Sequence, residues 1–234
     1  MCGRYVSPAE SEIERVWHVG RDSSNPFPRR YNVAPTALIP VLLRNPESDR
    51  LALHIARWGL IPHWWKDSKP PRLTFNARAE EASAKPMWRT PLRNTRCLVP
   101  AAGWYEWKEI ERTDPATGEI VKAKQPYFIH PPDDRLFCFA GVMSHWSKTG
   151  EDPQLSCALL TTAAAGLLKE VHERMPVVLP DEAHAAWLDP ELNDGADALA
   201  LAREHALTRF AYHPVSTRVN AATNDDPKLI EASN

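Results

Sequence analysis

Apolar and polar residues alternate in short runs along most of the chain, and this two-residue period predicts β-strands. The first two runs, 39–44 and 51–60, are separated by the turn-forming residues NPESD and predict a hairpin. The loop-like stretch ERTDPATGEIVKAKQ interrupts the later runs. Those runs cover 96–107, 126–131, 136–143, 155–162, 175–180 and 213–219. The chain is therefore expected to contain many short strands.

A helical period occurs in fewer places. In PAESEIERVWHV (8–19), Ile13, Val16 and Trp17 recur at helical spacing, and Ser7 is the expected N-cap. The stretch NPFPRRYNVAPT is too rich in proline for regular structure and predicts an ordered loop. Further short helices are predicted at 77–84, 165–172, 181–188 and 195–207.

Short strands with scattered helices and no regular βαβ alternation predict an α+β fold built on antiparallel β-sheet. With 234 residues, of which 43% are hydrophobic, the chain can bury a substantial core, and we expect a single domain over residues 1–234 with short flanking helices. The 22 prolines are spread over the whole length, which indicates rigid connections rather than one disordered linker.

Charge is distributed unevenly along the chain. The formal net charge of −2 argues against a protein that binds nucleic acids through overall basicity. Residues 57–108 nevertheless hold ten Lys and Arg against four Asp and Glu, a sum of +6 that leaves −8 for the remainder. This segregation is compatible with one anion-binding face, although ordinary solvated surface is the better explanation when it is taken alone.

Three of the four cysteines, Cys97, Cys138 and Cys157, lie in apolar strand-like runs, where a cysteine behaves as a small buried hydrophobe. The cysteines and histidines show no metal-ligand spacing, so we expect neither a metal nor a cofactor. The sequence has no secretory signal and no apolar run of membrane-spanning length. A cytoplasmic, reducing setting is the corresponding expectation, and it would keep the thiol of Cys2 available.

Cys2 is the cysteine that this explanation leaves out. After removal of Met1 it would carry an α-amine and a thiol on adjacent carbons, and the amine has a reference pKa of about 7.7–8.0. Such a pair can trap an aldehyde as an imine and then close a thiazolidine ring in an intramolecular step. The same residue could instead attack an amide as an N-terminal nucleophile. It could also be a buried start to a strand, without any chemistry.

Three short motifs add candidate groups. Strand alternation in TFNARAEEA would place Asn76, Arg78 and Glu80 on one face. Glu106 lies between aromatic residues in GWYEW, which can raise the pKa of a carboxyl and suit it to proton transfer. His172 ends a helix-like run in VHERMP and is a candidate acid or base. Taken singly, Asn76 is better explained as a turn former, Glu106 as an exposed strand residue and His172 as a helix-terminal cation.

An aromatic pair lies within the basic stretch. In WGLIPHWWKD, Trp64 and Trp65 are adjacent and Lys66 follows them. Aromatic planes beside cations can stack unpaired bases, at about 1–3 kcal/mol per base. Because two adjacent side chains are difficult to bury on one side of a strand or turn, at least one indole is expected to be exposed, although packing of both in the core is the alternative.

Seven motifs in this order, MCGRY, RYNVAPT, WGLIPHWW, FNARAEE, CLVPAAGWYEW, HERMP and HPVS, resemble the SOS response-associated peptidase (SRAP) family. That family includes the 5-hydroxymethylcytosine-binding, ES-cell-specific protein and bacterial relatives, whose type this chain resembles. The resemblance spans nearly the whole chain and implies a barrel-like fold. It also implies a monomer that recognises abasic sites in single-stranded DNA, crosslinks to them through the N-terminal cysteine, and is nucleoid-associated when bound.

The resemblance assigns roles to individual residues. Cys2 matches the crosslinking nucleophile, Asn76 the residue that orients the sugar, Glu106 the residue assisting proton transfer, and His172 the acid or base acting on the sugar. The positions that match DNA contacts are Arg4, Trp64, Trp65, Arg78 and Trp107.

The family description also implies abasic-site lyase activity and a peptidase activity that removes the protein's own leading residue. A cysteine peptidase or amidohydrolase using Cys2, and a non-catalytic reader of single-stranded DNA, remain the alternatives. The sequence departs slightly from the family pattern, because the stretch 111–124 is somewhat long and no extended C-terminal tail follows.

Overall fold

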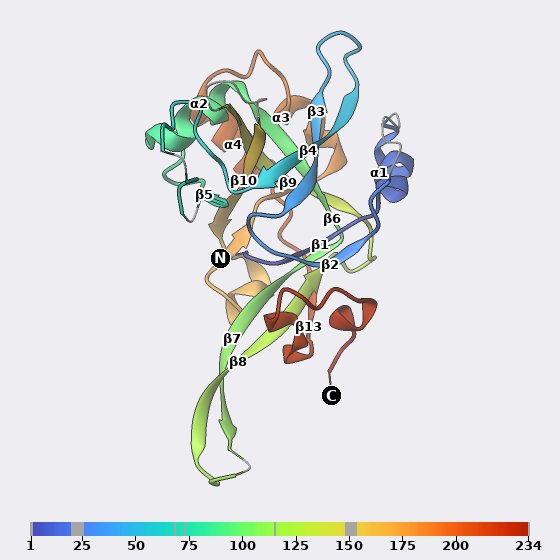
Figure 1. The fold of residues 1–234 in the computed structure, drawn as a ribbon, viewed down its shortest axis with the longest axis vertical. Helices are drawn as coiled ribbons and strands as arrows, with labels where there is room; N and C mark the ends of the chain where they lie inside the picture. Colours follow the sequence, from blue (N-terminus) through green and yellow to red (C-terminus); the bar gives the residue numbers. More distant parts are fainter. Residues whose placement is uncertain are drawn as a thin grey trace.

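Two β-sheets form the body of the protein in the computed structural model, which describes residues 2–19, 26–67, 69–72, 74–114, 116–147 and 154–233. Within these residues one sheet has five strands and the other has eight. The larger sheet and most helices lie at one end, and a long hairpin of the smaller sheet projects from the other (Figure 1). The predicted α+β class with predominantly antiparallel sheet is confirmed.

The larger sheet runs in the order β11-β10-β4-β3-β6-β9-β12, with β5 paired to β10. A further pairing of β9 with β10 bends it into a ring. Because β3 and β6 share one registered pair, Leu42 with Leu98, the ring is barrel-like without being a closed barrel. The strands are β3 (Leu38–Arg44), β4 (Leu51–Trp58), β5 (Asn76–Arg78), β6 (Arg96–Ala101), β9 (Phe137–Trp146), β10 (Gln154–Ala163), β11 (Arg174–Pro176) and β12 (Val178–Leu179).

The predicted hairpin is present, since β3 and β4 pair antiparallel along their length.

The smaller sheet runs in the order β13-β8-β7-β1-β2. The edge strand β2 lies within the proline-rich stretch 25–36, for which the sequence predicted only a loop. The strands are β1 (Tyr5–Ser7), β2 (Arg30–Val33), β7 (Gly103–Thr113), β8 (Ile120–His130) and β13 (Ala211–Pro214).

Residues 111–113 and 120–125 are strand, contrary to the loop predicted for 111–125 from the sequence. β7 and β8 are each 11 residues long and pair continuously from Trp104 and Ile129 to Thr113 and Ile120. The resulting ribbon projects away from the body (Figure 1). In its outer half, Ile110, Val121 and Ala123 on one face are half-buried, and the charged residues on the other face are exposed. This short alternation is interrupted by the turn residues between the strands, which is why the sequence suggested a loop.

The predicted strand 96–107 is two strands that belong to different sheets. β6 ends at Ala101 and β7 begins at Gly103, so the chain crosses from the larger sheet to the smaller one here. A Cβ atom on Gly103 would lie 2.4 Å from the ring of Phe128, so glycine is required for this close approach of β7 to β8.

The helices agree with the sequence in part. α1 (Glu10–Trp17), α3 (Asp181–Trp187) and α4 (Gly195–His205) occupy predicted segments. Ser7 is not the N-cap of α1, because it ends β1. The helix begins after Ala9, whose N–H donates to the Glu12 carboxylate at 2.8 Å. No helix among the described residues is both long and apolar enough to cross a membrane.

The helix predicted at 77–84 is wrong. Ala77 pairs with Leu160 of β10, and the N–H of Ala79 donates to the carbonyl of Thr161 at 2.9 Å, so sheet pairing overrides helical propensity. Turns follow, and α2 (Pro86–Asn94) begins after them with Pro86 at its first position. The segment 165–172 forms a short 3₁₀ turn, η1 (Gly166–Glu170), and two more lie near the C-terminus, η2 (Thr217–Asn220) and η3 (Pro227–Ile230).

An aromatic cluster between the sheets fixes the start of the chain. Tyr5 of β1 is fully buried and meets the rings of Trp58 and Phe139 edge-on, at centroid distances of 5.4 and 5.9 Å. Trp104 of β7 meets Phe139 in the same way at 6.0 Å. Because Tyr5 is anchored in this cluster, the residues immediately before it are held against β7 and the larger sheet.

Candidate active site

Cys2 lies at the junction of the two sheets. β1 pairs with β7 through Tyr5 and Trp104, and the N–H of Tyr105 donates to the carbonyl of Arg4 at 3.0 Å. From the larger sheet, the side-chain amide of Asn76 donates to the carbonyl of Cys2 at 2.7 Å. The first residues of the chain are thereby fixed from both sides.

The thiol of Cys2 is buried and uncharged. Its side chain is fully buried, and its Sγ lies 3.8 Å from the carbonyl oxygen of Arg4. Burial raises the pKa of this thiol well above its ordinary value, and the Glu106 carboxylate raises it further. The sulfur therefore needs a base to become a nucleophile. Burial alone fits a strand start as well as a reactive cysteine.

Glu106 supplies a group that can transfer protons near neutral pH. It lies on β7 and is 2% exposed, and burial raises the pKa of its carboxyl to about 7. The aromatic neighbours in the sequence therefore correctly indicated an unusual carboxyl. At neutral pH a large share of Glu106 is protonated and can donate, and the rest can accept.

His172 faces Glu106 from the loop between η1 and β11. Its Nε2 lies 3.9 Å from Glu106 Oε2, while its Nδ1 lies 3.0 Å from the N–H and 3.2 Å from the carbonyl of Arg174. The neutral ring accepts from that N–H at Nδ1 and keeps its proton on Nε2, whereas the charged ring can donate to the carbonyl. Burial lowers the pKa of His172, so the neutral form prevails near neutral pH.

An ion pair that sequence reasoning missed holds this loop. The guanidinium of Arg174 binds the Glu80 carboxylate through two hydrogen bonds of 2.8 and 2.9 Å and donates to the carbonyl of Thr161 at 2.7 Å. β5 ends at Arg78, so Glu80 lies beyond the strand in a turn and does not continue the face of Asn76. The signal was present in the sequence, because Arg174 belongs to HERMP and Glu80 to NARAE.

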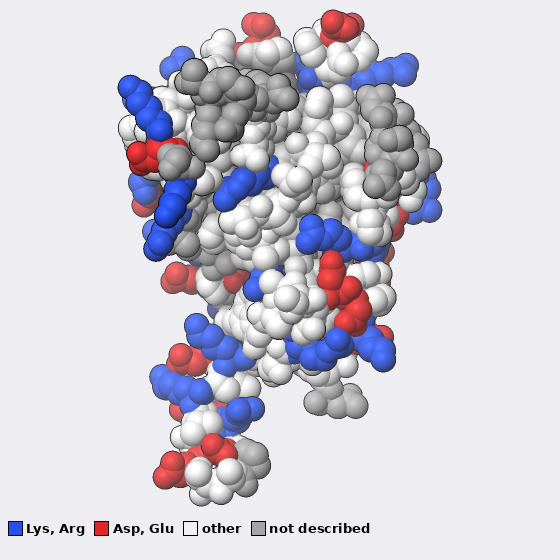
Figure 2. Space-filling view, in the orientation of Figure 1, with Lys and Arg blue, Asp and Glu red and all other residues white. Residues whose placement is uncertain are grey.

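The predicted stacking residues lie on exposed segments. Trp64 is 47% exposed, which confirms that at least one indole of the pair faces solvent. The two indoles lie 6.1 Å apart, and Trp65 donates from Nε1 to the carbonyl of Lys69 at 2.9 Å. The guanidinium of Arg78 is exposed and lies 4.0 Å from the Glu81 carboxylate. On the face shown in Figure 2, Lys and Arg side chains are scattered rather than gathered in one patch.

Arg4 and Trp107 both contact the C-terminal segment. Arg4 donates to the side chain of Asn32 at 3.1 Å and to the carbonyl of Val219 at 2.9 Å, and Trp107 donates from Nε1 to the side chain of Asn220 at 2.7 Å. Both side chains therefore tie residues after β13 to the smaller sheet. Their assignment to DNA remains a prediction.

Two of the four predicted catalytic residues, Glu106 and His172, border an open hollow of about 450 Å³ at the root of the ribbon, whereas Cys2 and Asn76 do not line it. It is lined by Glu106, Trp107, Lys124, His172 and Asn220. Lys124 and Asn220 were not among the predicted site residues, since Lys124 fell in the presumed loop and Asn220 lies in a segment without a motif. Among the described residues no cluster of three or more His, Cys, Asp or Glu could hold a metal ion.

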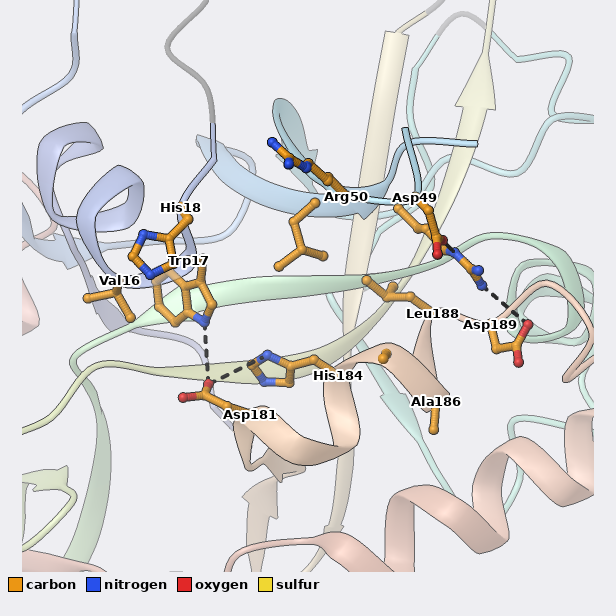
Figure 3. Close-up of a pocket in the computed structure, with 13 residues that line it drawn as sticks. Val16, Trp17, His18, Asp49, Arg50, Asp181, His184, Ala186, Leu188 and Asp189 are labelled. Atoms are coloured by element: carbon orange, nitrogen blue, oxygen red, sulfur yellow. Dashed lines mark hydrogen bonds and ion pairs between the residues drawn. The ribbon is translucent and has the colours of Figure 1, made fainter. Parts of the chain in front are cut away.

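A larger cavity of about 540 Å³ lies elsewhere, between α1, the β3–β4 hairpin and α3 (Figure 3). There the Asp181 carboxylate accepts from Trp17 Nε1 at 3.4 Å and lies 3.6 Å from Nδ1 of His184. None of the predicted site residues lines this cavity. Size alone therefore does not locate the candidate chemistry.

Comparisons with known proteins agree on one family. Residues 1–222 match the family model described as SOS response associated peptidase (SRAP). The chain is 36% identical over 234 residues to abasic site processing protein YoqW of Bacillus subtilis, covering 99% of this chain and 100% of that protein. It is 30% identical to abasic site processing protein HMCES of Mus musculus, covering 86% of this chain and 64% of that protein.

Solved structures show the same fold. A protein from Bacteroides thetaiotaomicron superposes with a TM-score of 0.80 at 22% identity, covering 100% of both chains. A phage-related protein from Bordetella bronchiseptica gives a TM-score of 0.66 at 32% identity, covering 92% of this chain and 94% of that one.

Proposed function

The chain belongs to the SOS response associated peptidase family, and on that premise we propose that it recognises abasic sites in single-stranded DNA and attaches to them covalently through Cys2. The observation that carries the proposal is the convergence of three groups on the start of the chain. Asn76 holds the carbonyl of Cys2, the buried Glu106 carboxyl has a pKa of about 7, and His172 faces that carboxyl. The names of the relatives, abasic site processing proteins, support the same substrate.

The chemistry needs an aldehyde, an amine and a thiol. The ring-opened sugar of an abasic site presents an aldehyde at C1′, and without a base it reaches a small pocket at low unstacking cost. After removal of Met1, which lies outside the described residues, the α-amine of Cys2 adds to this carbonyl. Water then leaves to give an imine, and the thiol adds across the C=N bond to close a thiazolidine. The overall reaction releases one water molecule and consumes no oxidant or reductant.

The residues of the site would move the protons in this sequence. Protonated Glu106 donates to the departing hydroxyl, and the resulting carboxylate takes the proton of the thiol as sulfur attacks. The nitrogen of the protonated imine keeps its own hydrogen in the ring, and the proton taken from the thiol returns Glu106 to its protonated starting state. His172, with its proton on Nε2, donates a hydrogen bond toward the sugar oxygens and helps to open the sugar ring.

The test is crosslinking to an oligonucleotide in which one uracil has been converted to an abasic site. The wild type should form an adduct that survives denaturation without reduction. Cys2→Ser keeps the amine but lacks the thiol, so its adduct should survive only after borohydride reduction of the imine. Cys138→Ala, which removes another buried thiol, should behave as the wild type. A denaturation-stable adduct of Cys2→Ser without reduction would contradict the thiazolidine.

A cysteine peptidase is the second candidate, because the family description names one and it would use the same buried Cys2. In that reaction the thiol attacks a peptide carbonyl and Glu106 serves as base. Turnover of a peptide by the mature protein, with no adduct on abasic DNA, would favour it. Salt-sensitive DNA binding without either reaction would favour a non-catalytic reader.

A further inference from the structure

The ribbon formed by β7 and β8 begins at the candidate site and has two chemically different faces. Residues directly opposite one another in an antiparallel pair share a face, and neighbours along a strand alternate. Lys108 pairs with Gln125 and Arg112 with Val121, so both cations lie on the face that carries Glu106. We call this the Glu106 face, and the opposite one the Trp107 face.

The charges of the ribbon are balanced in total but not by face. Residues 108–125 contain four cations and four acids. The Trp107 face holds Glu109, Glu111, Lys122 and Lys124, with Lys122 bound to Glu109 at 2.8 Å, so its charges cancel. Both signs are visible along the ribbon in Figure 2. On the Glu106 face, beyond Glu106 itself, the paired strands present the two cations Lys108 and Arg112 and no further acid.

The remaining two acids of this stretch lie at the tip of the ribbon, farther from Glu106 than Arg112 is. Asp114 and Glu119 follow and precede the paired strands, in the connecting turn. The Asp114 carboxylate accepts from the N–H of Ala116 at 2.8 Å, so it caps the turn. Within the described part of the chain, neither Lys108 nor Arg112 forms an ion pair with a carboxylate.

We propose that the Glu106 face of the ribbon is a track for the phosphate backbone of DNA on one side of the lesion. The proposal rests on the proposed function, because it places the damaged sugar at Glu106. Along the strand Lys108 lies about 7 Å from Glu106 and Arg112 about 20 Å, at about 3.4 Å per residue. A span of about 20 Å covers at most about six nucleotides, taking the rise of about 3.4 Å per nucleotide of one strand in a duplex, and fewer nucleotides of an extended single strand.

Charge complementarity favours a nucleic-acid backbone as the occupant. A phosphate chain carries regularly repeated negative charge and needs cations at intervals rather than one deep pocket. Lys108 and Arg112 provide this, separated by the small or apolar side chains of Ile110 and Ala123 on the same face. The face also continues into the site without a break, since Glu106 lies one alternation before Lys108.

The test compares Arg112→Gln with Lys122→Gln. Both substitutions remove one exposed cation, and the two residues lie in adjacent cross-strand pairs on opposite faces. Binding is measured on oligonucleotides that carry one tetrahydrofuran analogue of an abasic site, which has no aldehyde and cannot be crosslinked. A long flank of about ten nucleotides, which exceeds the reach of about six, lies on the 5′ side only, on the 3′ side only, or on neither side.

Arg112→Gln should weaken binding about two- to fivefold for one of the two long-flank substrates. It should also reduce the salt dependence of that binding by about 0.7 in log–log slope, as for one lost phosphate contact on a single strand. The short-flank substrate and Lys122→Gln should show no change. Lys108→Gln/Arg112→Gln should enlarge the effect on the same flank.

Equal effects of Arg112→Gln and Lys122→Gln, or an effect on the short-flank substrate, would overturn the track. Noncovalent binding is the readout here, so the result does not depend on whether an adduct forms. Conversely, if the track is wrong, the variant should still crosslink a short-flank substrate that carries a true abasic site at the wild-type rate. The two proposals can therefore fail separately.

Discussion

Two of the histidine–carboxylate pairs in the described part of the chain differ in which partner is buried. At the candidate site the Glu106 side chain is 3% exposed and lies 3.9 Å from His172, which is 25% exposed. At the cavity beside α3 the arrangement is reversed, because the Asp181 side chain is 73% exposed and His184, 3.6 Å away, is 6% exposed.

The difference decides what each pair can do. Burial raises the pKa of Glu106 to about 7, so this carboxyl exchanges protons near neutral pH. Burial lowers the pKa of His184, and the solvated Asp181 accepts from Trp17, so that pair joins α1 to α3. The Glu106 pair also unites residues distant in sequence, whereas Asp181 and His184 are neighbours on one helix. A histidine beside a carboxylate is therefore not by itself a site.

The largest expected effect is on the crosslinking rate, which should depend on the carboxyl of Glu106 and not on that of Asp181. Glu106→Gln should slow adduct formation on abasic DNA by about 10²–10⁴-fold, because general acid–base transfer is lost. Asp181→Asn, the matched change in the other pair, should leave the rate unaltered. Single-turnover crosslinking followed on denaturing gels measures both. Equal slowing by the two variants would show that the contrast in burial does not determine activity.

The second effect concerns stability and pH. The folded protein holds the Glu106 pKa near 7 against an ordinary value of 4.5, so the folded state binds the extra proton. This contribution is fully present below pH 4.5 and is lost as the pH rises through about 7, a change of about 3 kcal/mol. Urea unfolding at several pH values should show this loss as the difference between wild type and Glu106→Gln. His172 titrates in both proteins, so its opposite contribution to the pH dependence of stability cancels in this difference. A constant difference from acid to neutral pH would mean that Glu106 titrates normally.

The smallest effect tests the support of His172. Glu80→Gln removes one charge from the bidentate pair with Arg174 and should slow crosslinking about two- to fivefold, because an exposed ion pair contributes little. The pH profile of the rate should shift as well, since the N–H and carbonyl of Arg174 set the protonation of His172. Glu81→Gln, which breaks the neighbouring pair with Lys85, is the control. If neither the crosslinking rate nor its pH profile changes in Glu80→Gln, the ion pair of Glu80 with Arg174 is not needed to support His172.

Site residues could be predicted where their own chemistry or sequence position is unusual. Residues whose role depends on contacts with distant parts of the chain were harder to predict. Cys2, Glu106 and His172 stand out through position, aromatic neighbours and motif. Arg174 shares the HERMP motif with His172, but its partners Glu80 and Thr161, like the contacts of Asn220, lie far along the chain. Arg4 shows the same limit, since its hydrogen bonds to Val219 and Asn32 could not be foreseen from MCGRY.

The sequence by itself determined the α+β class, the β3–β4 hairpin, helices α1, α3 and α4, and the family, because local periodicity and motif order are properties of contiguous residues. Tertiary structure decided that residues 77 and 78 join a sheet instead of starting a helix, that 111–113 and 120–125 are paired strands, and that the Glu106 carboxyl is buried away from water. Sheet pairing and desolvation depend on segments that approach from elsewhere in the chain, and no local pattern contains them.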